Sequence, residues 1–363
     1  MAAVTAEEKD EPPEAAKKKE LIVAAPCISC VSWPPAVAER YEPLEKLGEG
    51  MFGDVYRARD RVGGRRLVAV KRLSGRTDER FVETSLRYFA REAMSLGACR
   101  GHPSVVKLVA THADSARSDG DCFLVTKYAG PLNLRQYTRL RSAEGRPFQE
   151  AEVRDAMRQL LSGARRVHDA GVLHRDMVPE NVIVDERRDG KKVVYRICDF
   201  GMSEPAARPG RDGSALLASP SPYRAPEIFL GSQDYDCRVD TWGLGCIMAE
   251  LIAGNGRPLF GADLDAKVFE KMQRAVGTQG MVEWPGLQRL ARRDLAAELR
   301  EKGCATYTGC LREVFPEEVL SEAGFEVLSG LLDANPERRL TAKAALRKPW
   351  FRRFSLAGFC FVP

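Results

Sequence analysis

Several features of secreted and membrane proteins are absent from this sequence of 363 residues. The first residues are acidic or small, without the basic segment and apolar stretch of a secretory signal. The apolar run at residues 21–25 is too short to span a bilayer. The ten cysteines are scattered rather than grouped into a disulfide framework, which favours reduced thiols. We therefore expect an intracellular protein, cytoplasmic or nuclear or both, with no membrane partner.

The sequence also has little that indicates nucleic-acid or structural-metal binding. The formal net charge is only +5, and the basic residues are spread along the chain. The lysine run at residues 17–19 is too short to be a dependable nuclear signal. Cys27 and Cys30 form one C-x-x-C without a second pair, which favours incidental cysteines over a metal or redox site. No nucleic-acid recognition motif occurs, so we expect no nucleic-acid partner.

Composition and periodicity divide the chain into a tail, a part rich in predicted strands and a longer part rich in predicted helices. Residues 1–40 are rich in Ala, Glu, Lys and Pro and are predicted to be a mobile tail. The part after the tail shows strand patterns at 44–50, 53–59, 66–72, 105–111 and 122–128. It shows one helical pattern, at 78–97. Helical patterns then dominate, at 133–141, 149–169, 237–254, 265–276 and 322–333, with β pieces at 182–184 and 193–198. We predict an α+β fold with an N-terminal lobe (41–129), a helical C-terminal lobe (130–354) and a short tail (355–363).

Five short motifs in a fixed order describe a phosphoryl-transfer site. They are Gly48-Glu49-Gly50-Met51-Phe52-Gly53, Val68-Ala69-Val70-Lys71, His174-Arg175-Asp176 with Asn181, Asp199-Phe200-Gly201 and Ala225-Pro226-Glu227. In this order they resemble the motif set of protein kinases. The glycine loop alone is a weak signal, because it also opens dinucleotide-binding folds. Here the loop lies between two predicted strands, and Lys71 follows it on a third predicted strand. We therefore expect the bilobal kinase fold.

The first two motifs suit the binding of ATP. Glycines let backbone N–H groups come close to phosphate oxygens. Lys71 lies in an apolar strand, where an unpaired ammonium group would be costly, so we expect an anionic partner. Glu92 is favoured over Glu83, because the residues around Glu92 align with the family's helix without gaps. The resemblance assigns Lys71 and Glu92 to the catalytic machinery.

The catalytic loop carries both the expected chemistry and one departure from it. Asp176 is expected to orient the attacking hydroxyl and accept its proton, and Asn181 and Asp199 to supply oxygens for Mg²⁺. Val178 stands where most Ser/Thr kinases have a lysine that neutralises the γ-phosphate. One preorganised charge contact contributes on the order of 2–4 kcal/mol to transition-state stabilisation. Two hypotheses stay open: a kinase weakened by Val178, and a nucleotide-binding pseudokinase that acts as a scaffold.

Longer stretches resemble the cyclin-dependent kinase group (CMGC) of Ser/Thr protein kinases. They are residues 223–228 (YRAPEI), 240–251 (DTWGLGCIMAEL), 284–286 (WPG) and 335–339 (NPERR). The resemblance implies an ion pair between Arg339 and Glu227, and a tether from Asp240 to the catalytic loop. It also implies ATP and Mg²⁺ as cofactors and a protein as substrate. The nucleotide-site residues that it implies are Leu47, Gly48, Gly50, Gly53, Val55, Ala69, Lys71, Thr126, Lys127, Tyr128, Ala129 and Ile183.

Several regulatory features of the group are not matched. In the cyclin-contact helix only residues 90–92 (Ala-Arg-Glu) agree, which leaves dependence on a cyclin-type activator open. Met51 and Phe52 replace the two hydroxyl residues that inhibitory kinases phosphorylate, so we expect that control to be absent. The activating phosphosite falls on Ser214 when counted forward from Asp199 and on Ala215 when counted back from Glu227.

Two further positions bear on specificity. Thr126 takes the gatekeeper place, and Cys198 faces the pocket in related kinases, where a packed thiol is favoured over a reactive one. Arg224 favours a proline after the acceptor residue. Pro220, like Val178, stands where a marker of Ser/Thr over Tyr specificity would be. Group membership still favours Ser and Thr as acceptors.

Overall fold

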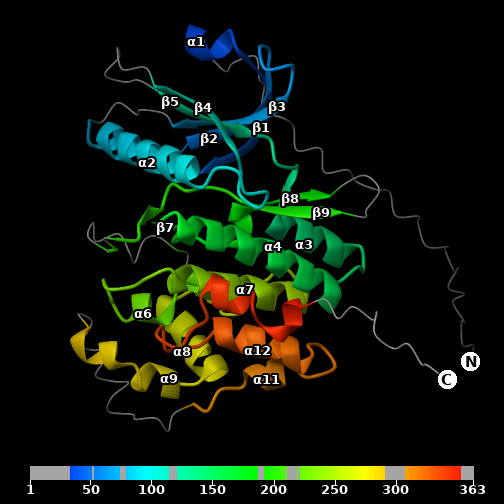
Figure 1. Ribbon diagram of the computed structural model, residues 1–363, viewed down its shortest axis with the longest axis vertical. Helices are drawn as coiled ribbons and strands as arrows, with labels where there is room; N and C mark the ends of the chain where they lie inside the picture. The colour runs from blue at the N-terminus through cyan, green and yellow to red at the C-terminus, as the bar shows by residue number, and fades with distance from the viewer. Residues whose placement is uncertain are drawn as a thin grey trace, which may run out of the picture.

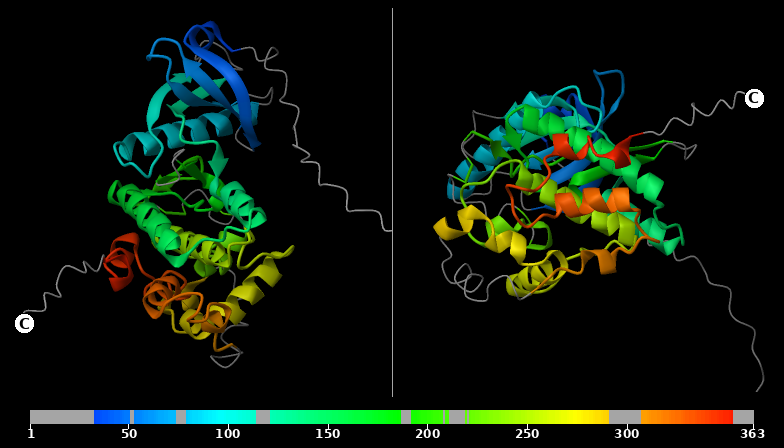
Figure 2. Two further views of the ribbon diagram at one scale, coloured as in Figure 1. Left: turned by 90° about the vertical axis from the view of Figure 1, so that its right-hand side faces the viewer. Right: turned by 60° about the horizontal axis from the view of Figure 1, so that its bottom comes forward.

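The computed structural model describes residues 33–50, 53–73, 79–113, 121–186, 192–207, 209–210, 219, 221–290 and 307–352. A β-rich N-terminal lobe lies above a larger helical lobe (Figure 1), which confirms the predicted α+β bilobal architecture. Seen from the side, the two lobes stack along the long axis of the molecule (Figure 2). No helix in these ranges is both long and apolar enough to cross a membrane.

The N-terminal lobe is an antiparallel sheet, five-stranded within the described residues, in the order β1-β2-β3-β5-β4. Its strands are β1 (Tyr41–Gly50), β2 (Gly53–Asp60), β3 (Leu67–Leu73), β4 (Leu108–Ala113) and β5 (Cys122–Lys127). The predicted strand at 105–111 begins too early, because Val105 and Val106 pair with the other lobe. The Val106 N–H donates to the Ile197 carbonyl at 3.0 Å.

The helix of the N-terminal lobe, α2 (Glu79–Ala98), packs against β4 and β5 (Figure 1). It was predicted at 78–97. Its buried face carries Glu92, Ser95 and Leu96, because residues three and four apart lie on the same side of a helix. The Glu92 carboxylate is therefore directed toward the sheet.

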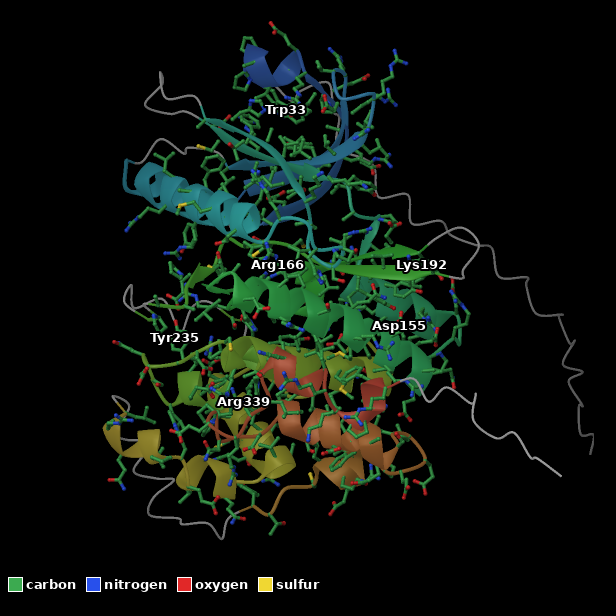
Figure 3. The ribbon with its side chains drawn as sticks, viewed as in Figure 1. Trp33, Asp155, Arg166, Lys192, Tyr235 and Arg339 are labelled. Carbon is green, nitrogen blue, oxygen red and sulfur yellow. The ribbon has the colours of Figure 1, made fainter. Side chains whose placement is uncertain are left out.

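Ordered structure begins earlier than the predicted start near Tyr41. The short helix α1 (Pro35–Ala38) covers the outer end of the sheet (Figure 1). Trp33, labelled in Figure 3, is buried and meets the rings of Tyr56 and Phe123 edge-on, at centroid distances of 5.7 and 6.1 Å. The exposed face of a sheet needs an apolar cover, and a four-residue helix is too short to show periodicity in the sequence.

The C-terminal lobe is assembled around α4 and α7, which pack against each other. The predicted long helices are observed as α3 (Leu134–Ala143), α4 (Glu150–Asp169), α7 (Arg238–Ala253), α8 (Asp265–Val276) and α12 (Glu322–Leu331). Shorter elements were not predicted: α6 (Pro226–Phe229), α9 (Gln279–Val282), α11 (Leu311–Val314), α13 (Ala342–Ala345), η2 (Pro179–Asn181), η3 (Ser221–Tyr223), η4 (Pro285–Arg289) and η6 (Pro349–Phe351). A single helical turn has too few residues to show a period.

Two small sheets lie between the helices and the N-terminal lobe. One contains β6 (Leu132–Asn133), β8 (Val182–Glu186) and β9 (Val193–Ile197), and the other pairs β7 (Val172–Leu173) with β10 (Glu204–Pro205). The two β pieces predicted at 182–184 and 193–198 are β8 and β9, which pair antiparallel as a hairpin between Asn181 and Asp199. The ends of this hairpin therefore lie side by side beneath the N-terminal sheet.

A buried ion pair stabilises the centre of the helical lobe. Arg339, labelled in Figure 3, makes two hydrogen bonds of 2.7 Å with the carboxylate of Glu227, which confirms the predicted pair. Its guanidinium group also lies 5.0 Å from the ring centre of Trp242 in α7. Removing one partner of such a pair costs about 3–5 kcal/mol, because the other charge is left buried and unpaired.

Candidate active site

A cavity of about 250 Å³ lies between the N-terminal sheet and the β8–β9 hairpin. The predicted nucleotide-site residues that line it are Leu47, Gly48, Val55, Ala69, Lys71, Thr126, Lys127, Tyr128, Ala129 and Ile183. The exposed surface of the lining is mostly apolar, and the ion-paired side chains of Lys71 and Asp199 also line the cavity. The cavity thus suits a flat aromatic base joined to an anionic group.

Two of the glycines predicted for the nucleotide site, Gly50 and Gly53, pair with each other at the tip of the β1–β2 hairpin. Gly53 is not among the residues that line the cavity. Its φ is +117°, and a Cβ atom there would lie 1.9 Å from the carbonyl oxygen of Arg72. Gly53 is therefore required by the close approach of β3. By contrast, a Cβ atom on Gly48 would meet nothing within 4 Å, which leaves space beside the cavity.

Sequence reasoning missed further residues of the lining. They are Leu96, Val106, Leu124, Gly130 and Glu180. Leu96 lies one helical turn after Glu92, so the spacing in α2 could have indicated it. Gly130 has a φ of +156°, and a Cβ atom there would lie 2.1 Å from the Val184 carbonyl oxygen. The need for glycine at position 130 follows from the close approach of β8, which only the tertiary structure shows.

Lys71 contacts two carboxylates, Glu92 in its own lobe and Asp199 in the C-terminal lobe. Its Nζ atom lies 2.8 Å from Glu92 Oε2 and 2.8 Å from Asp199 Oδ1, so the predicted pair with Glu92 is present. Burial opposes the charge, but Asp199 and Glu92 together hold the pKa of Lys71 above its usual range. Burial raises the pKa of Glu92, an effect that Lys71 partly offsets. The ammonium group is thus charged and fixed at the end of the cavity.

Asp199 is held in an unusual backbone conformation. Its φ is +59°, which is uncommon for a residue other than glycine and clusters at functional sites. Its Oδ1 atom also accepts from the Gly201 N–H at 3.3 Å. Although burial opposes ionisation, Lys71 keeps the pKa of Asp199 below its usual value. The carboxylate is therefore ionised beside the cavity.

The catalytic loop is tied to α7 through Asp240. Asp240 Oδ2 accepts from the His174 N–H at 2.9 Å, and Oδ1 accepts from the Arg175 N–H at 2.7 Å, which confirms the predicted tether. His168 Nε2 lies 2.8 Å from Oδ2. Burial alone would lower the pKa of His168, but the bond with Asp240 raises it to about 9. A protonated histidine thus balances the buried carboxylate.

Asp176 and Asn181 form one unit within this loop. Asn181 Nδ2 donates to Asp176 Oδ2 at 2.7 Å and to the Asp176 carbonyl oxygen at 3.0 Å. The other carboxylate oxygen, Oδ1, is buried without a hydrogen-bond partner among the described residues. Burial and the negative charge of Asp199 raise the pKa of Asp176 to about 7. Such a group can exchange a proton near neutral pH.

A groove of about 610 Å³ opens beside Asp176. Val178 lines it with a side chain that is 3% exposed, in the position where the sequence resemblance implies a lysine. Arg135 also lines the groove and bonds Glu180, Tyr223 and, at 2.8 Å, Glu250. The carboxylates of Glu180 and Glu250 are therefore already paired, whereas Asp176 keeps one oxygen without a partner among the described residues.

The donor set fits Mg²⁺, which prefers oxygen ligands and is usually held by one or two carboxylates together with substrate phosphates. Asn181 donates from its amide nitrogen to Asp176, and Asp199 accepts from Lys71 through Oδ1. Within the described ranges, the Asn181 Oδ1 and Asp199 Oδ2 atoms make no hydrogen bond, so both remain for a cation. Across these ranges no three His, Cys, Asp or Glu side chains could hold a metal alone.

Other predicted features are resolved by burial or lie elsewhere. Cys198 lines the cavity, but burial and the charge of Asp199 raise its pKa, which supports the packed-thiol interpretation. Met51, Phe52, Ser214, Ala215 and Pro220 lie outside the described residues.

Comparisons with known proteins agree with this geometry. Residues 41–351 match the family profile described as Protein kinase domain. A protein of Oryza sativa subsp. japonica provisionally named cyclin-dependent kinase F-2 is 47% identical over 318 residues, 86% of this chain and 90% of that protein. Cyclin-dependent kinase B2-2 of Arabidopsis thaliana is 31% identical over 321 residues, 87% of this chain and 95% of that protein. Cyclin-dependent kinase G-2 of Oryza sativa subsp. indica is 34% identical over 91% of this chain, which spans only 44% of that protein.

Proposed function

Because this chain belongs to the protein kinase family, as a cyclin-dependent-kinase-like Ser/Thr kinase, we propose that it phosphorylates Ser or Thr residues followed by proline. The observation that carries the proposal is that the ion pair of Lys71 and Asp199 lines the cavity together with Asn181, to which Asp176 is hydrogen-bonded. Phosphoryl transfer depends on positioning and charge stabilisation, and this arrangement supplies both.

Each residue has a distinct part in the proposed reaction. Lys71, fixed by Glu92, binds phosphate oxygens of ATP, and Gly48 leaves room for them. Asn181 and Asp199 would hold Mg²⁺, which supplies neutralisation of the phosphate charge when bound. Asp176 accepts the proton of the substrate hydroxyl through Oδ1, the oxygen that has no partner among the described residues. A hydroxyl donor from the substrate would complete its hydrogen bonding.

The preference for proline rests on Arg224. Its Nη2 atom donates to the Ser219 carbonyl oxygen at 3.1 Å, and its Nη1 atom lies 2.8 Å from Asp265 Oδ2. A carbonyl that already accepts from Arg224 offers little to the N–H of a substrate residue. Proline has no N–H group and loses nothing there. Substrates with proline after the acceptor are thereby favoured.

We predict that ATP binds only in the presence of Mg²⁺, and that Asp199→Asn weakens this binding at least tenfold. Isothermal titration calorimetry with Mg²⁺ and ATP measures both. Asp155→Asn is the matched control, because Asp155 is an exposed residue of α4 (Figure 3). Absence of binding heat in folded wild-type protein would reject the nucleotide site.

We predict transfer of labelled phosphate from ATP to a Ser-Pro peptide, with kcat/KM about 10- to 100-fold above that for the matched Ser-Ala peptide. Asp199→Ala provides the inactive control. Equal rates for the two peptides would reject the proline preference alone. ATP binding without transfer to any protein or peptide would favour the pseudokinase.

A cyclin-type activator would bind the exposed face of α2. There Leu86 and Met94 are 44% and 75% exposed, two helical turns apart, on the side opposite Glu92. In the transfer assay we expect a purified cyclin to raise kcat, and Met94→Glu to remove the increase without changing basal activity. No increase with wild-type protein would reject activation by the cyclin.

The substrate is proposed to be an intracellular protein. The free cysteines within the described ranges support a reducing compartment, cytoplasmic or nuclear: Cys99, Cys122, Cys198, Cys237, Cys246 and Cys310.

A further inference from the structure

A buried carboxylate lies directly behind the catalytic loop. Glu204 belongs to β10, three residues after Gly201, and only 4% of its surface is exposed. A charged side chain at such a site must be paired and hydrogen-bonded. Its Oε2 atom lies 3.2 Å from Nη1 of Arg175, the residue that precedes Asp176.

Glu204 also binds two other parts of the C-terminal lobe. Its Oε1 atom accepts from the Tyr235 hydroxyl at 2.5 Å, and both carboxylate oxygens lie 3.3 Å from the Gly210 N–H. Tyr235, labelled in Figure 3, follows α6 and precedes α7. The single carboxylate therefore connects the catalytic loop, the segment after Gly201 and the loop before α7.

Arg175 depends on this cluster for its position. Its φ is +66°, a strained backbone conformation that only surrounding contacts can maintain. Its side chain donates from Nε to the Met202 carbonyl oxygen at 2.7 Å and from Nη1 to the Tyr235 hydroxyl at 3.1 Å. Fixing the guanidinium group fixes the backbone of the next residue, Asp176.

The same short segment also holds α2. Ser203 Oγ lies 2.7 Å from Ser95 Oγ, and both side chains are buried. Ser95 lies on the face of α2 that carries Glu92. Residues 203 and 204 thus connect both halves of the site, α2 on one side and the catalytic loop on the other.

In many kinases the corresponding order is produced by phosphorylation, through new contacts between arginine and phosphate. We propose that Glu204 is a built-in anion that positions Arg175, so that catalytic activity does not require phosphorylation of the segment after Gly201. A carboxylate makes the same kind of charge-assisted hydrogen bond to arginine as a phosphate does. A phosphate brought to the same guanidinium would instead meet the negative charge of Glu204. This inference rests on the proposed kinase function.

The first test uses the wild-type protein. After treatment with a broad-specificity phosphatase, with mass spectrometry showing no phosphate on residues 199–227, we expect kcat to stay within about twofold of the untreated value. Activity that disappears on dephosphorylation and returns on rephosphorylation would overturn the inference and leave the proposed function intact. Transfer absent from both forms would overturn both.

The second test replaces the anion. We expect Glu204→Gln to lower kcat by about 10- to 100-fold, the effect of one charge-assisted hydrogen bond, with KM for ATP within about twofold. Glu317→Gln, an exposed surface change, is the control. In Arg175→Met protein, Glu204→Gln should add less than about threefold, because the two residues act as one unit.

Folding of the variants is checked by thermal unfolding, and Glu204→Asp serves if Glu204→Gln does not fold. The aspartate keeps the charge, so its kcat should stay closer to the wild-type value than the kcat of Arg175→Met does. Full kcat in folded Glu204→Gln, or fully additive losses in the double variant, would show that Glu204 does not position Arg175 and would overturn the inference.

Discussion

Asp176→Asn is expected to lower kcat by about 10²- to 10⁴-fold, the usual contribution of a general base. Asparagine keeps the size of the side chain but cannot accept the proton of the substrate hydroxyl. The amide oxygen of the asparagine can still accept from Asn181 Nδ2, which lies 2.7 Å from Asp176 Oδ2 in the wild type. Asp169→Asn is the matched control, because Asp169 is an exposed aspartate near the end of α4. Wild-type kcat in Asp176→Asn would exclude Asp176 as the base.

The same substitution is expected to raise stability. Burial and Asp199 raise the pKa of Asp176 from 3.8 to about 7 in the folded protein. Between these pH values the unfolded chain is ionised there while the folded chain is protonated, so this group lowers the free energy of unfolding as pH rises to about 7. Asparagine removes that penalty, and we expect a higher Tm than wild type at pH 7.5. A lower Tm would mean that the amide disrupts the loop.

The pH dependence of the wild type follows from the same pKa. Only ionised Asp176 can accept a proton, so kcat/KM should rise with pH up to about 7 and level off above it. The nucleotide-free protein is the relevant state, because kcat/KM reports the pKa values of the free enzyme. A profile without a rise in this range would indicate that another group limits the reaction.

Val178→Lys is expected to raise kcat by about 10- to 1,000-fold, the range that a contact of about 1.4–4 kcal/mol in the transition state implies. Val178 borders the same groove as Asp176, and the groove volume of about 610 Å³ leaves room for a longer side chain. Its backbone N–H donates to the Asp176 carbonyl oxygen at 3.1 Å, and its own carbonyl accepts from the Asn181 N–H at 3.0 Å. Both bonds are independent of the side chain and should persist.

The gain should appear mainly in kcat, because charge on the γ-phosphate is redistributed during transfer. Val178→Met is the control: it adds length without charge and should leave kcat nearly unchanged. An equal gain in both variants would show that shape rather than charge limits the wild type. An unchanged rate with lysine would mean that another cation already acts there. The groove carries Arg139, and Arg139→Gln in the wild type would then identify it.

Much of the fold and of the site could be predicted from local sequence. Alternation with period two indicated the strands of the N-terminal sheet, and helical period indicated the long helices of the other lobe. The motif order identified Lys71, Asp176 and Asp199. The structure pairs Lys71 with Asp199 beside the cavity, although residues 71 and 199 are 128 positions apart, and Asn181, which also lines the cavity, bonds Asp176. The fold prediction succeeded because side-chain type and spacing reflect burial and backbone geometry within one element, whereas the catalytic roles of the three residues stay a prediction.

Tertiary packing alone decided the remaining features. Trp33 gave no periodic signal, yet it covers the sheet, because its partners in β2 and β5 are distant in sequence. Gly53 serves the approach of β3 rather than lining the cavity. Glu204 belongs to none of the motifs in the sequence. Its pairing with Arg175 arises only because β10 passes close to the catalytic loop. The sequence by itself thus determined the family and the two lobes, and it predicted the reacting groups. Which buried charges neutralise one another depended on contacts between distant segments, since a buried charge is stable only beside a partner that the fold brings to it.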